Sequence, residues 1–145
     1  MSNLAFYEAL CALANIQRDV AKSFHADKKD LLINATAQQV LLAIRNAPNS
    51  SMGEISAKIG LEKGSFTKIA DTLIAYRLVA RVQGEDRRTS KLSLTEDGKR
   101  IAELIARLLD DHIEKILSPL PKEDRTALTD AVLTAAKRSE ELQIR

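Results

Sequence analysis

Apolar residues recur at helical spacing along most of this chain and show strand-like alternation in a single stretch. Over residues 4–25 they fall three to four positions apart, which predicts an amphipathic helix. The same spacing predicts five further helices, which run from near Thr36 to Asn46, Ser51 to Gly60, Lys63 to Tyr76, Thr95 to about Leu117, and Lys122 to about Gln143. The pattern therefore predicts a mainly helical fold.

The strand-like stretch covers residues 78–94. Leu78, Ala80 and Val82 share one face of an extended chain, and Leu92 and Leu94 share one face of the next. A period of two predicts two half-buried strands with these residues facing the core. The intervening residues 84–89 are too polar for a core. We therefore expect a small β-hairpin with a basic tip, flanked by helices on both sides.

Residues that begin or end helices mark the boundaries of these elements. Thr36 is suited to cap the second predicted helix, and Thr95 the helix after the hairpin. Ser51 and Glu54 have the spacing of a capping box, and Gly60 suits a left-handed residue after the short helix that follows. Two short helices joined by such a turn form a helix-turn-helix. The hairpin after it predicts a winged helix-turn-helix between N-terminal and C-terminal helices.

The second helix of this motif carries candidate contacts to DNA. Such a helix enters the major groove, where short polar and basic side chains reach bases and phosphates. Ser65, Thr67 and Lys68 are expected on its exposed face. Phe66 and Ile69 point the other way at this spacing, so they are expected to hold the helix to the core.

The hairpin adds a second set of candidate contacts. Arg87 and Arg88 are expected to probe a narrow minor groove, whose negative potential attracts an extended arginine. Asp86 lies two positions before Arg88 and is expected to pair with an arginine and fix the turn. Lys91, on the returning strand, completes the predicted DNA-binding residues.

Composition gives modest support to an anionic partner. The chain is 45% hydrophobic and 29% charged, so it is able to bury a core. Its net charge is only +2, but the segment from Met52 to Arg100 holds ten Lys and Arg against seven Asp and Glu. The basic excess therefore lies in the segment that carries the hairpin.

Other candidate chemistry is sparse. Cys11 is the single cysteine, and its apolar neighbours predict an inert, buried or interfacial side chain. Asp110, Asp111, His112 and Glu114 diverge around one predicted helix, which argues against a metal site. No nucleophile–base arrangement or phosphate-binding glycine loop is visible. We expect no enzyme activity, cofactor or metal, and the lack of a signal pattern or membrane-length apolar run predicts a cytoplasmic protein.

Several of these motifs together resemble the MarR-type transcriptional regulators. They are Gly60-Leu61, Gly64-Ser-Phe-Thr-Lys68, Leu78-Val-Ala-Arg81, Asp86-Arg-Arg88 and Leu94-Thr-Glu-Asp-Gly98, with Thr36-Ala-Gln38 at an earlier helix start. The resemblance follows the whole helix order. It implies one domain over residues 1–145, with dimerisation helices at about 1–30 and 100–145 around a DNA-binding lobe at about 34–98.

The resemblance also implies how such a protein works. It implies a homodimeric repressor whose two recognition helices read a pseudo-palindromic operator in double-stranded DNA, released by a small, often aromatic or anionic effector or by an oxidant. Arg88 would be the wing arginine and Asp86 its orienting partner. Two alternatives stay open at this point: a winged helix that serves only protein contacts, and a repressor that senses oxidants through Cys11.

The chain departs from the family pattern at two positions. Lys68 stands where an arginine is common, and a lysine is a point charge that loses bidentate readout. Arg77 stands where a glycine is common. If that position requires a positive φ angle, Arg77 carries strain on the order of 1 kcal/mol.

Overall fold

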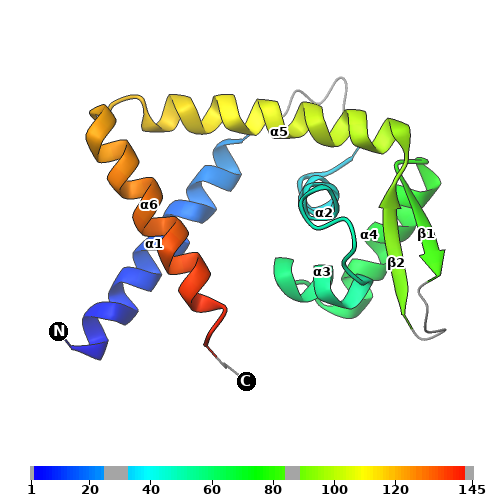
Figure 1. Cartoon of the computed structure of the whole chain (residues 1–145), viewed down its shortest axis with the longest axis horizontal. Coiled ribbons are helices and arrows are strands. Elements are labelled where there is room, and N and C mark those ends of the chain that lie inside the picture. Colours follow the sequence, from blue (N-terminus) through cyan, green and yellow to red (C-terminus); the bar gives the residue numbers. More distant parts are fainter. Residues whose placement is uncertain (1, 25–32, 84–88, 143–145) are drawn as a thin grey trace. The chain divides into compact units, whose positions relative to one another are not determined.

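The computed structural model describes residues 2–24, 33–83 and 89–142. Over these residues the chain forms six helices and one pair of strands (Figure 1). In chain order they are α1 (Asn3–Ser23), α2 (Ala35–Asn46), α3 (Met52–Ile59), α4 (Lys63–Ala75), β1 (Val79–Gln83), β2 (Ser90–Leu94), α5 (Glu96–Leu117) and α6 (Lys122–Ser139). The predicted fold class, mainly helical with a β-hairpin, is confirmed. The chain divides into two compact units, residues 1–109 and 110–145.

One hydrophobic core holds the lobe formed by α2, α3, α4, the hairpin and the start of α5. Apolar side chains from each of these elements are buried in it: Val40, Leu41, Ile44, Ile55, Phe66, Ala70, Leu73, Val79, Leu92, Ala102 and Ile105. Figure 1 shows these elements gathered around α2. Most of them are short, so their stability depends on this shared burial of apolar surface.

Local capping residues explain where the helices begin, with one correction. Asn34, not Thr36, caps α2, because its side-chain oxygen accepts a hydrogen bond from the Ala37 N–H at 2.9 Å. The cap lies two residues early because Ile33 and Ala37 must both reach the core. Ser51 caps α3 as predicted and accepts from the Glu54 N–H at 3.1 Å. The last helix ends at Ser139, four residues before the predicted end.

The hairpin forms as predicted, but the inward face of its first strand is shifted by one residue. Val79 is buried, whereas Ala80 and Val82 are exposed and Leu78 is half-buried. The strands are antiparallel, with Val79 opposite Leu94 and Ala80 opposite Ser93. Directly opposed residues share a face, so the partner strand decides which face of β1 is buried. The predicted inward positions of β2 are confirmed at Leu92, which is buried, and at Leu94, which is half-buried.

The motif Leu94-Thr-Glu-Asp-Gly98 closes the base of the hairpin onto the start of α5. The Thr95 hydroxyl donates to the Arg77 carbonyl oxygen at 2.7 Å and accepts from the Gly98 N–H at 3.0 Å. The Thr95 N–H donates to the Leu78 carbonyl oxygen at 3.1 Å. Thr95 therefore caps α5 as predicted and also ties this helix to the chain entering β1.

Arg77 has the positive φ angle that its position in the motif indicated. Its φ is 58°, and among the described residues no other non-glycine residue is in this region. Its N–H donates to the Ile74 carbonyl and its carbonyl accepts from Thr95, so hydrogen bonds on both sides hold this conformation. A side chain with a Cβ atom is strained there by about 1 kcal/mol.

Replacing Arg77 by glycine should therefore stabilise the protein. We expect Arg77→Gly to raise the free energy of unfolding by about 1 kcal/mol in urea titrations, since glycine adopts positive φ without a steric penalty. Arg77→Ala keeps the Cβ atom and removes the same charge, so it should change stability by less than about 0.5 kcal/mol. Equal stability of the Arg77→Gly and Arg77→Ala variants would show that the backbone at this position is not strained by a Cβ atom.

An ion pair links α2 to α5 within the same lobe. Arg45 Nε lies 2.9 Å from Glu103 Oε2, and Arg45 Nη2 lies 3.2 Å from Glu103 Oε1. This is a two-point contact between planar groups. Hydrogen bonding by Arg45, reinforced by its charge, holds the pKa of Glu103 below its usual range.

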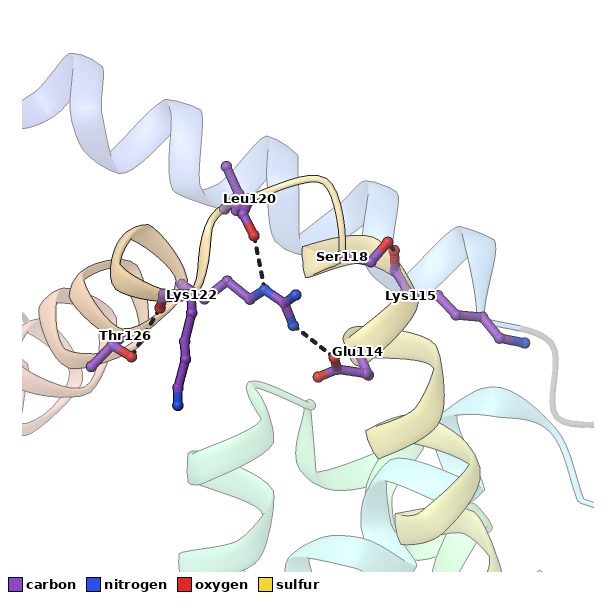
Figure 2. Close-up of polar contacts among 7 residues, drawn as sticks. Glu114, Lys115, Ser118, Leu120, Lys122 and Thr126 are labelled. Atoms are coloured by element: carbon purple, nitrogen blue, oxygen red, sulfur yellow. Dashed lines mark hydrogen bonds and ion pairs between the residues drawn. The ribbon is translucent and has the colours of Figure 1, made fainter.

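In the second unit, one arginine organises the connection between α5 and α6. Arg125 Nη1 lies 2.7 Å from Glu114 Oε1, and Arg125 Nε donates to the Leu120 carbonyl oxygen at 3.0 Å. In Figure 2, dashed lines mark these two contacts at the labelled Glu114 carboxylate and Leu120 carbonyl; the Arg125 side chain between them carries no label. Ser118 adds a hydrogen bond to the Lys115 carbonyl oxygen at 2.7 Å. Side chains from both helices therefore hold the connection in one conformation.

Candidate nucleic-acid interface

α3 and α4 form the predicted helix-turn-helix. Gly60 ends α3 with φ 69° in the left-handed region, and its N–H donates back to the Ala57 carbonyl at 3.2 Å. The Leu61 N–H donates to the Ser56 carbonyl, while the Ser56 hydroxyl donates to the Leu61 carbonyl at 2.9 Å. These bonds satisfy the last carbonyls of α3 and set the direction in which the chain enters α4.

α4 presents a polar face to solvent and an apolar face to the core. Ser65, Thr67 and Lys68 are exposed, as predicted. Phe66 is buried and Ile69 is half-buried, also as predicted. The Thr67 hydroxyl donates to the Lys63 carbonyl at 2.9 Å, so its oxygen remains available as an acceptor. α4 thus has the division of faces that a groove-binding helix requires.

The predicted hairpin contacts divide into a described and an undescribed group. Asp86, Arg87 and Arg88 lie outside the described residues. Lys91 lies on β2, is half-buried, and forms a β-bridge with Ser51, the residue that caps α3. Its backbone therefore attaches the hairpin to the start of the helix-turn-helix. Lys91 is half-buried, whereas Lys68 is exposed.

A cavity of about 620 Å³ opens where α3, the start of α4 and the start of β2 meet. Hydroxyl-bearing residues from all three elements line it: Ser51, Ser56, Thr67, Thr89 and Ser90. Phe66, Met52 and Leu61 form an apolar part of the wall, and Lys63 adds a positive charge at the rim. The Ser56 and Thr67 hydroxyls donate to backbone carbonyls, whereas the Ser51 hydroxyl accepts from the Glu54 N–H, which leaves its own O–H able to donate beside α4.

Sequence reasoning missed one charged pair in this region. Arg81 on β1 lies with Nη2 3.5 Å from Asp71 Oδ1 on α4, and both side chains are largely exposed. No spacing rule predicts it, because the two residues belong to a helix and a strand. The same holds for Arg45 and Glu103, which are 58 positions apart. Only the position of α4 beside the hairpin brings Asp71 and Arg81 together.

The remaining candidate residues do not form a second site. Cys11 is exposed, so the expectation of burial within the chain is wrong; α1 has no buried residue of its own. The interfacial alternative for Cys11 stays a prediction. Within the described ranges no cluster of three or more His, Cys, Asp or Glu is placed to hold a metal ion. None of the helices described combines the length and hydrophobicity needed to cross a membrane.

Large apolar side chains of α1 and α6 face solvent in the single chain. On α1 they are Leu4, Phe6, Tyr7, Leu10, Leu13 and Ile16, which are 40–63% exposed. On α6 they are Leu128, Val132 and Leu133, at 43–62%. Exposed apolar surface of this extent usually marks an interaction site.

Comparison with known proteins connects this arrangement to one family. Residues 33–89, which span α2, the helix-turn-helix and the first strand of the hairpin, match the model of the MarR family. The HTH-type transcriptional regulator SarZ of Staphylococcus aureus is 27% identical over 110 residues, which cover 74% of each chain.

Solved structures with the same fold cover nearly the whole chain. A MarR protein from Peptoclostridium difficile superposes with a TM-score of 0.76 at 22% identity, over 92% of this chain and 88% of that one. FabT of Streptococcus pneumoniae, determined in complex with DNA, gives 0.65 at 22% identity, over 98% and 100%. PcaV of Streptomyces coelicolor, determined with its natural ligand, gives 0.64 at 18% identity over 89% of both chains.

The match of residues 33–89 covers α2, the helix-turn-helix and β1 but ends before the motif Leu94-Thr-Glu-Asp-Gly98, and the likeness in fold extends to the terminal helices. Residues 33–89 of this chain therefore match the MarR family, and the described residues have the winged helix-turn-helix fold of MarR-family structures.

Proposed function

We propose that this protein is a homodimeric, sequence-specific DNA-binding repressor. The observation that carries the proposal is the polar face of α4, where Ser65, Thr67 and Lys68 are exposed while Phe66, Ala70 and Leu73 anchor the opposite face. A helix held in this way is able to enter the major groove while the adjacent hairpin reaches the backbone or minor groove. FabT, which shares the fold, is known in complex with DNA.

The chemistry of the lobe fits a nucleic-acid partner. Lys68 supplies a positive charge for a phosphate or a guanine. Ser65 supplies a hydroxyl that is able to donate or to accept a hydrogen bond. The Ser51 hydroxyl in the cavity beside α4 is able to donate to the sugar–phosphate backbone, to which most protein–DNA hydrogen bonds go. Arg87 and Arg88 would extend these contacts into the minor groove, with Asp86 as their orienting partner and Lys91 at the base.

The exposed apolar faces of α1 and α6 support the dimer. In this proposal residues 34–98 form the DNA-binding lobe, while helices at about 1–30 and 100–145 join two chains. Burial of these faces against a second copy would remove several large apolar side chains from water. A small-molecule effector, as PcaV has in its structure, would release the dimer from DNA. We expect the chain to have no enzymatic activity of its own.

Selection from genomic fragments with the purified full-length chain tests the proposal. We expect enrichment of a pseudo-palindromic sequence whose half-sites are centred about one helical turn apart, bound by two chains per site. Sedimentation of the free protein should give the mass of two chains. Failure to enrich any competitor-resistant sequence would overturn DNA binding and favour a winged helix that serves protein contacts.

The contribution of each cation is measurable once the operator is known. Lys68→Ala and Arg88→Ala should each weaken operator binding and reduce the slope of log affinity against log salt by about 1, because each removes one charge near the phosphates. Lys137→Ala, on the exposed surface of α6 and outside residues 34–98 of the proposed DNA-binding lobe, removes the same charge and should leave the slope unchanged. Unchanged affinity of Arg88→Ala across the salt series would refute a role for the wing.

A further inference from the structure

The ion pair between Asp71 and Arg81 is unusual for a surface expected to face DNA. Asp71 lies four residues after Thr67, so both side chains lie along the same side of α4. An exposed carboxylate there would repel phosphates. Arg81 lies with Nη2 3.5 Å from Asp71 Oδ1, and it reaches α4 from the neighbouring strand β1. The pair therefore compensates this charge and links two elements at once.

Along β1, burial in the lobe is confined to the first residue of the strand. Val79 is buried, but the next residues of this strand, Ala80 to Gln83, are all exposed. On the returning strand, Leu92 is buried and Lys91 is bridged to Ser51. A two-stranded hairpin alone is marginally stable in water, so its direction depends on such attachments. Beyond Val79, the Arg81 side chain on β1 is linked to α4 by its ion pair with Asp71.

We propose that the Asp71–Arg81 pair is a positioning device that holds the hairpin at a set angle to α4. Arg81 would act through the carboxylate of Asp71, and neither side chain would need to touch a base. The functional role of this positioning rests on the proposed DNA binding. The orientation of the hairpin is itself a property of the free protein. The rival reading is that Arg81 contacts a phosphate directly.

The two readings predict opposite effects for Asp71→Asn. If Arg81 is a phosphate contact, loss of the neighbouring carboxylate frees it and removes a repulsive charge, so operator affinity should rise. If the pair positions the hairpin, affinity should fall by about two- to fivefold, the range that an exposed ion pair contributes to an equilibrium. Asp97→Asn makes the same charge change but breaks an exposed ion pair with Arg100 inside one helix, α5, so it should have little effect.

A double-mutant cycle with a charge exchange completes the test. Arg81→Gln should weaken binding as Asp71→Asn does, and the double variant should be no weaker than the weaker single variant. The exchange variant Asp71→Arg with Arg81→Asp should recover affinity. Tighter binding by Asp71→Asn, or additive losses in the double variant, would overturn the inference.

Amide hydrogen exchange in the free protein separates this inference from the proposed function. Positioning predicts faster exchange of the Val79–Gln83 and Ser90–Leu94 amides in Asp71→Asn, by about two- to fivefold, with the core amides of α2 unchanged. Unchanged exchange in the hairpin would overturn positioning whether or not DNA is bound. Faster exchange in a protein that binds no operator would uphold positioning and reject the proposed function.

Discussion

The variant Gly98→Ala is expected to lose most of its stability, with a fall of more than about 3 kcal/mol in the free energy of unfolding. A Cβ atom built on Gly98 lies 2.9 Å from the carbonyl carbon of Leu78 and closer still to its oxygen. Both are backbone atoms, so no side-chain rotation relieves the overlap. The Leu78 carbonyl also accepts the Thr95 N–H at 3.1 Å, so moving it away breaks the base of the hairpin.

A second glycine provides the matched control. Gly53 lies in the first turn of α3, and a Cβ atom there would meet only the Ser51 hydroxyl oxygen at an ordinary 3.9 Å. Gly53→Ala should therefore be neutral or stabilise by up to about 1 kcal/mol, since alanine is the better helix former. Urea titration of both variants measures the difference. A loss below about 1 kcal/mol for Gly98→Ala would contradict the prediction, because it would mean that the start of α5 moves away from Leu78 at little cost.

The variant Phe66→Ala is expected to lose about 3–5 kcal/mol of unfolding free energy, the range measured for buried aromatic side chains. Phe66 is only 2% exposed and is the largest buried side chain on α4. Its removal also enlarges the cavity that it lines beside α3. Because Phe66 lies between Ser65 and Thr67, the loss of this anchor should lower operator affinity as well as stability.

Tyr76 is the control for this prediction. It caps the C-terminal end of α4 and is 48% exposed, so Tyr76→Ala should cost less than about 1 kcal/mol and leave DNA binding intact. Phe66→Leu retains part of the buried apolar surface and should fall between the two. Thermal and urea unfolding measure the stability of each variant. Operator affinity, measured at a temperature where all the variants are folded, measures DNA binding separately. Similar losses for Phe66→Ala and Tyr76→Ala would contradict the anchoring role.

Local side-chain chemistry explains why the helix-turn-helix was predictable. Ser51 and Gly60 act within a few residues of themselves, by capping and by a left-handed conformation, so their patterns carry the same meaning in any fold. Phe66, Ala70 and Leu73 recur at three- to four-residue spacing, and this spacing predicted the buried face of α4 in the same way. The exposed positions of Ser65, Thr67 and Lys68 follow from it, whereas their role in DNA binding is still a prediction.

Predictions failed where two local choices were nearly equal. Apolar residues occupy both faces of β1, with Val79 on one face and Ala80 and Val82 on the other, so a period of two does not select the buried face. Pairing of Val79 with Leu94 does. Asn34 and Thr36 are both suitable caps, and packing of the neighbouring residues selects Asn34. Both the buried face of β1 and the capping residue of α2 are therefore selected by packing against residues that lie elsewhere in the sequence.

By itself, the sequence determined the order of the helices, the helix-turn-helix, the hairpin and the polar face of α4, because capping, turn formation and amphipathic spacing act over one or two helical turns. The tertiary structure alone decided the inward face of β1, the close approach of Gly98 to Leu78 and the pairing of Asp71 with Arg81 and of Arg45 with Glu103. These features join different elements, and contact between elements depends on how the shared core packs them together.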